Sequence, residues 1–242
     1  MTIRASQVCF RFSRDWSLGP ITLTIPGGAV TALVGPNGAG KTTFMRILSG
    51  LMVPDKGSVA LEGLAARGRS FLRKAVSFVG SEPAFPEGAR IADIVRYKLQ
   101  VQGIPRKGQE AHISMIEERL GQRRSCSPHD LSRGQRLGLA IELALAGDPG
   151  IVILDEPWAG LDPVATEVLL GRLKRTSQRG SVVLVSSHDV YSLPQISSNY
   201  AFLSGGKLKA AGTIDQLRAV VNSQEAAPAD VLRAVFRAMA KG

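Results

Sequence analysis

The sequence predicts an α/β fold with a mostly parallel sheet, an N-terminal antiparallel β subdomain and an inserted α-helical subdomain. Compact apolar runs alternate with helical patterns, which is typical of a parallel sheet covered on its faces. The first forty residues have the pattern of β structure, whereas residues 90–146 have the pattern of helices without an intervening strand. No apolar stretch approaches the roughly 18–20 residues needed to cross a bilayer.

Strands are expected first at Val8–Phe12 and at Ile21–Ile25, where apolar and polar residues alternate. After a turn at residues 26–28, the apolar run Ala29–Val34 predicts a buried parallel strand. A helix should follow, because apolar residues recur on one helical face. They are Phe44, Ile47, Leu48 and Leu51.

The rest of the chain predicts three more strands and several helices. The strands are Ala75–Val79, Ile151–Leu154 and Ser181–Val185, with a helix after Pro163 between the last two. The inserted helices are expected at Arg90–Gln102, Gln109–Gly121 and Gly134–Ala146. A loose polar stretch, Asn222–Ala229, precedes an apolar helical stripe from Val231 to Met239.

The composition indicates a globular protein with an anionic partner. Apolar residues make up 44% of the 242 residues, which excludes disorder of the whole chain. Thirty Lys and Arg against twenty Asp and Glu give a charge of +10, which favours a nucleotide, a nucleic acid or a lipid surface. Two cysteines, Cys9 and Cys126, predict neither a disulfide framework nor a structural zinc. Residues 1–12 lack the apolar segment of a secretory signal.

A phosphate-binding loop is predicted between the strand ending at Val34 and the helix that follows it. Residues 35–42 match G-x-x-x-x-G-K-[ST], the pattern of a P-loop NTPase core. Its glycines allow successive N–H groups to surround an anion, and the helix adds its positive end. Lys41 is expected to reach the β- and γ-phosphates, and Thr42 to ligate Mg²⁺. The expected nucleotide contacts are Gly35, Pro36, Asn37, Gly38, Ala39, Gly40, Lys41, Thr42 and Thr43.

Two carboxylates, Asp155 and Glu156, follow the buried strand Ile151–Leu154. Carboxyl ends of parallel strands line the ligand crevice, so we expect Asp155 beside the phosphate loop, where it helps hold Mg²⁺ directly or through water. Glu156 could orient or deprotonate the attacking water.

The pentapeptide Leu131–Gln135 lies between the phosphate loop and the acidic pair. Alone it would predict a serine N-cap. In this order, however, the motifs over roughly residues 2–220 resemble the nucleotide-binding domain of ATP-binding cassette (ABC) proteins, and the pentapeptide resembles their LSGGQ signature. The resemblance implies that Asp155 is the Walker B aspartate and Glu156 the catalytic glutamate. Residues 159–162 resemble the D-loop.

The resemblance also assigns roles to two single residues. His188 resembles the catalytic switch histidine, with a capping or surface histidine as the alternative. Phe12 falls where an aromatic residue usually stacks on adenine, with a core aromatic as the alternative.

The family architecture implies two cassettes packed head to tail around two ATP molecules. Ser132, Gly134 and Gln135 would then meet the γ-phosphate of the other cassette. The partner would be a second ABC nucleotide-binding subunit, identical or related.

The sequence departs from the family pattern at two places. Arg133 replaces a glycine of the signature. Ser81, or Glu82 in a register shifted by one, stands where the family has the Q-loop glutamine. Either side chain offers an oxygen to Mg²⁺ or water, so Ser81 is retained as a metal-site residue, but neither matches glutamine in reach.

The resemblance implies an ATP-binding and hydrolysing subunit that powers a transporter through a separate membrane-spanning permease. The loop at residues 83–86 and the short C-terminal helix are similar to export-type bacterial cassettes, which favours export. We expect a cytoplasmic location, peripheral at the inner face of the membrane. Segment 90–124 carries eight Lys and Arg against four acidic residues, which suits anionic headgroups or simply a solvated surface.

Two alternatives stay open: a non-transport ABC ATPase that acts on nucleic acid or the ribosome, and a cassette that barely hydrolyses ATP. A nucleic-acid partner is disfavoured because neither a second cassette nor a coiled-coil insertion is seen.

The expected domains are the nucleotide-binding domain at 1–222 and a helical tail at 223–242. Within the first, the α/β core takes about 1–80 and 147–222, and the helical subdomain about 82–146.

Overall fold

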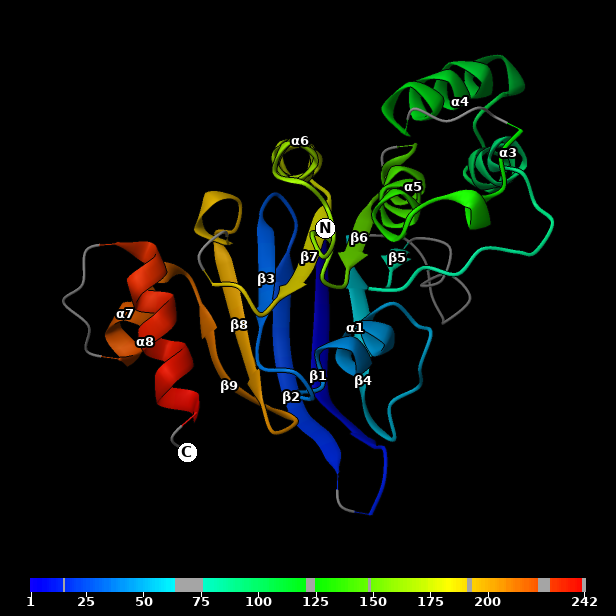
Figure 1. Cartoon of the computed structure of the whole chain (residues 1–242). Helices are drawn as coiled ribbons and strands as arrows, with labels where there is room; N and C mark the ends of the chain where they lie inside the picture. The colour runs from blue at the N-terminus through cyan, green and yellow to red at the C-terminus, as the bar shows by residue number, and fades with distance from the viewer. Residues whose placement is uncertain are drawn as a thin grey trace.

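The larger of two sheets carries the parallel strands (Figure 1). The structure is a computed structural model that describes residues 1–14, 16–63, 76–120, 125–147, 149–190, 193–221 and 227–240. In order across the sheet, the strands are β5 (Val76–Val79), β6 (Ile151–Leu154), β7 (Val182–Ser187), β3 (Val30–Val34), β8 (Asn199–Ser204) and β9 (Lys207–Gly212). The first five run parallel, and β9 pairs antiparallel with β8. The predicted α/β class is confirmed.

The smaller sheet is antiparallel and comes from the N-terminal region, as predicted. Its order is β2 (Ser17–Pro26), β1 (Thr2–Arg11) and β4 (Lys56–Glu62). Helix α1 (Lys41–Leu48) shares one apolar cluster with both sheets, and its Phe44 and Leu48 are fully buried there. This packing fixes α1 at the end of β3, where its N-terminus continues the phosphate loop.

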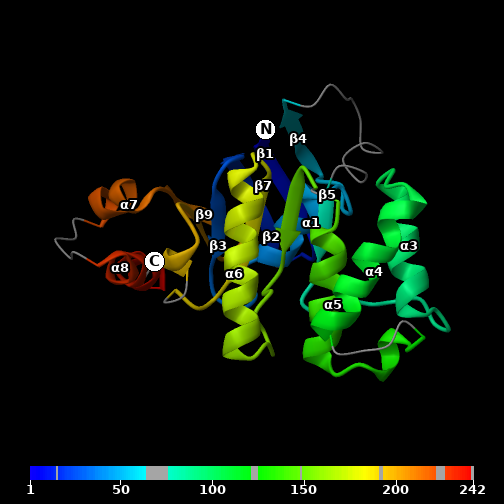
Figure 2. The ribbon, with the colours of Figure 1, turned by 90° about the horizontal axis from the view of Figure 1, so that it is seen from above.

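The opposite face of the large sheet is covered by helices (Figure 2). They are α5 (Arg133–Leu145), α6 (Pro163–Gln178), α7 (Ile214–Val220) and α8 (Pro228–Ala240). Helix α6 begins with Pro163 at its first position, and Asp162 caps it by accepting from the Ala165 N–H at 2.8 Å. Two short 3₁₀ turns are also present, η1 (Pro128–Asp130) and η2 (Leu193–Gln195).

The inserted helices form a unit with its own apolar core beyond the β5 edge of the sheet (Figure 1). Helices α3 (Ile91–Val101) and α4 (Arg106–Leu120) pack there against one side of α5. Helix α5 also lies in the core of the large sheet, with Leu137 and Ile141 facing it. It therefore links the insert rigidly to the α/β core.

Several elements differ from the prediction. The expected strand Val8–Phe12 is the end of the longer β1, which stops one residue before Phe12. The sequence analysis did not identify β4, β8, β9 or α7. Parts of three predicted features lie outside the described residues. They are Ala75 of the strand Ala75–Val79, residues 121–124 of the basic segment 90–124, and residues 222–226 of the polar stretch Asn222–Ala229. The domain boundaries stay a prediction, and no helix in the described ranges is long and apolar enough to cross a membrane.

The docking of α8 gives a stability prediction. Leu232 on α8 is fully buried in the core of the large sheet. Leu232→Ala should lower the free energy of unfolding by about 2–5 kcal/mol, because it removes buried apolar volume. Val220→Ala is the control, since Val220 is 65% exposed and its change should stay within about 0.5 kcal/mol. Urea unfolding followed by circular dichroism measures both, and equal effects would show that α8 is not docked.

Candidate nucleotide-binding site

The candidate site lies where the carboxyl ends of parallel strands meet. The phosphate loop follows β3, Asp155 and Glu156 follow β6, and Ser186 is the penultimate residue of β7. Ser81 follows β5 by two residues. Because neighbouring parallel strands end at the same edge, residues far apart in the chain gather in one crevice.

The backbone of the phosphate loop takes a shape that favours glycine. Gly38 has φ of 77° and Gly40, the N-cap of α1, has φ of 98°. A Cβ on Gly40 would stand 2.7 Å from Cδ1 of Leu18. No side chain caps α1, so its first N–H groups remain available to an anion.

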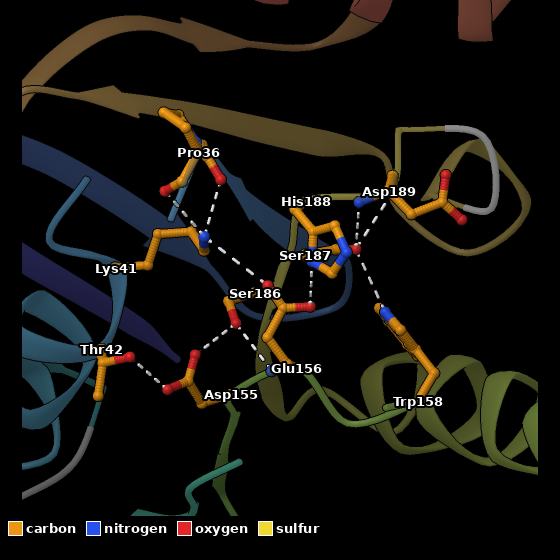
Figure 3. Close-up of polar contacts among 11 residues, drawn as sticks. Pro36, Lys41, Thr42, Asp155, Glu156, Trp158, Ser186, Ser187, His188 and Asp189 are labelled. Atoms are coloured by element: carbon orange, nitrogen blue, oxygen red, sulfur yellow. Dashed lines mark hydrogen bonds and ion pairs between the residues drawn. The ribbon is translucent and has the colours of Figure 1, made fainter. Parts of the chain in front are cut away.

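Lys41 lies at the mouth of this loop (Figure 3). Its ammonium donates to the carbonyl oxygens of Gly35 at 2.7 Å and Pro36 at 3.3 Å, and lies 3.7 Å from Oε1 of Glu156. The residue is only 7% exposed. A buried cation between loop carbonyls and a carboxylate is well placed to exchange these contacts for phosphate oxygens.

Asp155 joins three elements at the floor of the site (Figure 3). Its Oδ2 accepts from the Thr42 hydroxyl at 2.5 Å, and its Oδ1 accepts from the Ser186 hydroxyl at 2.6 Å. Its backbone N–H donates to Val79 O on β5 at 2.8 Å. The side chain is buried, so these bonds fix it relative to α1, β5 and β7.

Glu156 has an uncommon backbone conformation, with φ of 49°. Its N–H donates to the Ser186 hydroxyl at 2.8 Å, and its Oε2 lies 3.1 Å from Nδ1 of His188. Its Oε1 is buried without a hydrogen-bond partner among the described residues. Such a backbone conformation costs about 1–3 kcal/mol at a residue other than glycine, and residues of this kind cluster at functional sites. One carboxylate oxygen is thus oriented by His188, and the other can accept a proton.

Aromatic side chains form the outer wall. Phe12 and Trp16 meet edge to face, with ring centroids 6.2 Å apart. Phe12 is 74% exposed, so the alternative reading as a core aromatic is wrong. With the phosphate loop, Ser81 and the acidic pair, both rings line a cavity of about 510 Å³, within the usual range for a ligand of nucleotide size.

Sequence reasoning missed Ser186 and Trp16. The hydroxyl of Ser186 hydrogen-bonds to both acidic residues. The feature of the sequence that could have indicated it is a serine near the end of a buried strand, two residues before His188. Trp16 lies four residues after Phe12, and its carbonyl accepts from the Phe12 N–H at 3.1 Å. No sequence motif indicates a short loop contact of this kind.

The signature residues lie apart from this cavity. Ser132 and Gln135 bond each other's backbone N–H groups as a capping box at the start of α5. Gly134 packs against the carbonyl of Gly160, where a Cβ would come within 2.6 Å. With Ser132 and Gln135, Gly134 lines a different groove between α5 and α6. Within one chain, therefore, these residues do not meet the phosphate loop.

The two departures from the family pattern lie next to each other. A guanidinium nitrogen of Arg133 lies 3.4 Å from Oε1 of Glu82, and both side chains are exposed. Helix α5 has no acidic residue in its first turn, so Glu82 supplies a negative charge near its positive end. Ser81, in contrast, lines the nucleotide cavity.

The oxygen atoms present fit Mg²⁺. The Thr42 hydroxyl and the Asp155 carboxylate converge at the phosphate loop. Mg²⁺ at nucleotide sites is usually held by one or two carboxylates together with phosphates and water. The described part of the chain holds no cluster of three or more His, Cys, Asp or Glu suited to a metal.

Comparisons with known proteins agree on one family. A family model described as ABC transporter matches residues 18–159. The ABC-type transporter ATP-binding protein EcsA of Bacillus subtilis is 28% identical over 223 residues, which cover 91% of this chain and 90% of EcsA. The sulfate/thiosulfate import ATP-binding protein CysA of Caulobacter vibrioides is 32% identical over 90% of this chain and 66% of CysA. A solved ATP binding subunit of an ABC transporter is 26% identical, with a TM-score of 0.87 over 97% of this chain and 99% of the other.

The contacts of Ser186 give a prediction about catalysis. Ser186→Ala removes the hydroxyl that bonds Asp155 and the Glu156 backbone, so kcat of ATP hydrolysis should fall at least about tenfold, equivalent to about 1.4 kcal/mol. Ser49→Ala is the control, because this buried serine donates to Arg46 O, away from the site. Steady-state turnover at saturating ATP measures both variants. Unchanged turnover in Ser186→Ala would show that this hydroxyl does not hold the acidic pair in place.

Proposed function

This chain belongs to the ABC transporter family, and we propose that it is one of two cassettes that share ATP between them and drive a separate membrane-spanning permease. It is an ABC ATPase, which binds ATP and hydrolyses it to drive transport. The observation that carries the proposed site is the meeting of Lys41, which lies after β3, with Asp155 and Glu156, which follow β6, where these two parallel strands end.

In the proposed mechanism, the loop N–H groups and Lys41 bind the β- and γ-phosphates. Thr42 and Asp155 would hold Mg²⁺, with Ser81 contributing through water, and the ion would neutralise the charge that develops on the phosphates. Glu156 orients the attacking water with its Oε1, which has no hydrogen-bond partner among the described residues, and takes up the proton of that water. His188 holds the other oxygen of Glu156 and so keeps the carboxylate aimed at the γ-phosphate.

A second cassette is proposed because one chain does not bring its own signature to its own nucleotide. Ser132, Gly134 and Gln135 begin α5 and line a groove that shares no residue with the nucleotide cavity. In a head-to-tail pair, the start of α5 of each cassette would face the other's γ-phosphate, as the resemblance implies. The second cassette is identical or related.

The proposed permease is a separate chain, which receives force through the helical insert and holds the cassette at the inner face of the membrane. Export is our proposal for the direction of transport, and it rests on the similarity of the loop at residues 83–86 to export-type cassettes. Of the relatives, CysA is named an import protein, whereas the name of EcsA gives no direction. Identification of the permease that co-purifies with this chain would decide the direction.

Replacement of the proposed general base tests the mechanism. Glu156→Gln should keep ATP binding but slow hydrolysis about 10²- to 10⁴-fold, because an amide cannot accept the proton of water. Unhydrolysed ATP should then hold two cassettes together, as size-exclusion chromatography with light scattering in ATP and Mg²⁺ would show. Glu167→Gln, at an exposed position of α6, is the control and should turn over normally. The proposal fails if Glu156→Gln hydrolyses ATP at the normal rate, or stays monomeric although the full complex is active.

A further inference from the structure

Trp158 lies in the segment that leads from β6 to α6, close to the end of β7 (Figure 3). Its ring is partly buried against the apolar core of the large sheet. Its indole Nε1–H donates to the hydroxyl oxygen of Ser187 at 3.2 Å. Neither residue lines the nucleotide cavity, so this bond can affect hydrolysis only through another residue.

The Ser187 hydroxyl fixes the turn that carries His188. Ser187 is the last residue of β7 and is fully buried. Besides the bond from Trp158, its oxygen accepts from the Asp189 N–H at 2.9 Å, and its own proton can be donated to Asp189 O at 3.3 Å. A serine hydroxyl that bonds the backbone two residues further on stabilises a turn. The backbone on both sides of His188 is therefore tied to the Ser187 hydroxyl.

His188 depends on this turn because its side chain is not enclosed by packing. The side chain is 65% exposed, and its Nδ1 lies 3.1 Å from Oε2 of Glu156. An exposed imidazole has several allowed rotamers, so its contact with Glu156 requires a backbone held in the right place. Glu156 and Trp158, two residues apart in one segment, thus contact His188 and Ser187, which are neighbours at the end of β7.

We propose that Trp158 is a positioning residue for ATP hydrolysis, which acts through Ser187 to keep His188 against the carboxylate of Glu156. The inference rests on the proposed roles of Glu156 and His188 and adds the residue that holds the two together. A buried indole N–H usually finds a partner, so the bond by itself shows only that this donor is satisfied. What assigns the role is the acceptor, which directly precedes His188 and bonds the residue after it.

Loss of the indole donor gives a distinct kinetic effect. Trp158→Phe keeps an aromatic ring against the core and removes the N–H, so kcat of ATP hydrolysis should fall about three- to tenfold, the effect of one neutral hydrogen bond. KM for ATP should stay within about twofold, because the groups that line the nucleotide cavity are unchanged. Ser187→Ala removes the acceptor and the turn contact together, so it should lower kcat at least as far.

The variants are tested in the full chain, at a protein concentration where specific activity has levelled off and light scattering shows equal dimer fractions. Circular dichroism checks that each variant is folded. Tyr97→Phe is the matched control, because it removes the polar group of an aromatic side chain that is 71% exposed on α3. This control should turn over normally.

The decisive measurement compares Trp158→Phe in two backgrounds, with His188 present and with His188→Ala. ATP labelled at the γ-phosphate and followed for hours measures the slow chains. If Trp158 acts through His188, Trp158→Phe should lower kcat three- to tenfold in the first background and less than about 1.5-fold in the second, because the two changes are then not additive.

Two results would overturn this role of Trp158 while the proposed function stands. One is normal turnover in Trp158→Phe. The other is an equal loss of kcat with and without His188, which would mean that the indole N–H only supports the packing of its segment. Normal turnover in His188→Ala would overturn the proposed role of His188 together with that of Trp158.

Discussion

The site depends on the buried carboxylate of Asp155. Its two oxygens accept from Thr42 on α1 and Ser186 on β7, while its own N–H bonds β5. Asp155 therefore sets the distance between the helix that carries the phosphate loop and the strands that carry the catalytic groups. Ser186 extends the same network to the backbone of Glu156, so the conformation of Glu156 follows from the position of Asp155.

Two charged groups of the site have only weak contacts within the protein. Lys41 bonds carbonyls of its own loop and lies 3.7 Å from Oε1 of Glu156, which has no hydrogen-bond donor among the described residues. A triphosphate offers Lys41 stronger, charged acceptors, and water offers Glu156 a donor. The groups that ATP would engage are thus those that have only weak contacts within the protein.

Much of this could be predicted from the sequence because motifs and strand ends determine it. The pattern at residues 35–42 gives both the loop and its neighbouring elements, and the carboxylates after Leu154 reach the crevice because parallel strands end together. Edge strands such as β4 and β9 were missed, since their mixed polar sequences have no buried-strand pattern. The contact of Arg133 with Glu82, 51 residues apart, depends on how the insert packs on the core. The capping box of α5 can be predicted from neighbouring residues of the sequence. The distance of this helix start from the nucleotide cavity cannot, because it depends on the tertiary packing.

In the proposed pair of cassettes, each chain holds half of each catalytic site. The most direct test is the specific ATPase activity of the purified chain, measured with its oligomeric state over the micromolar range. Since only paired cassettes hydrolyse ATP in this account, specific activity should rise with protein concentration in parallel with the dimer fraction and then level off. A specific activity that stays constant while light scattering shows a monomer throughout would contradict it.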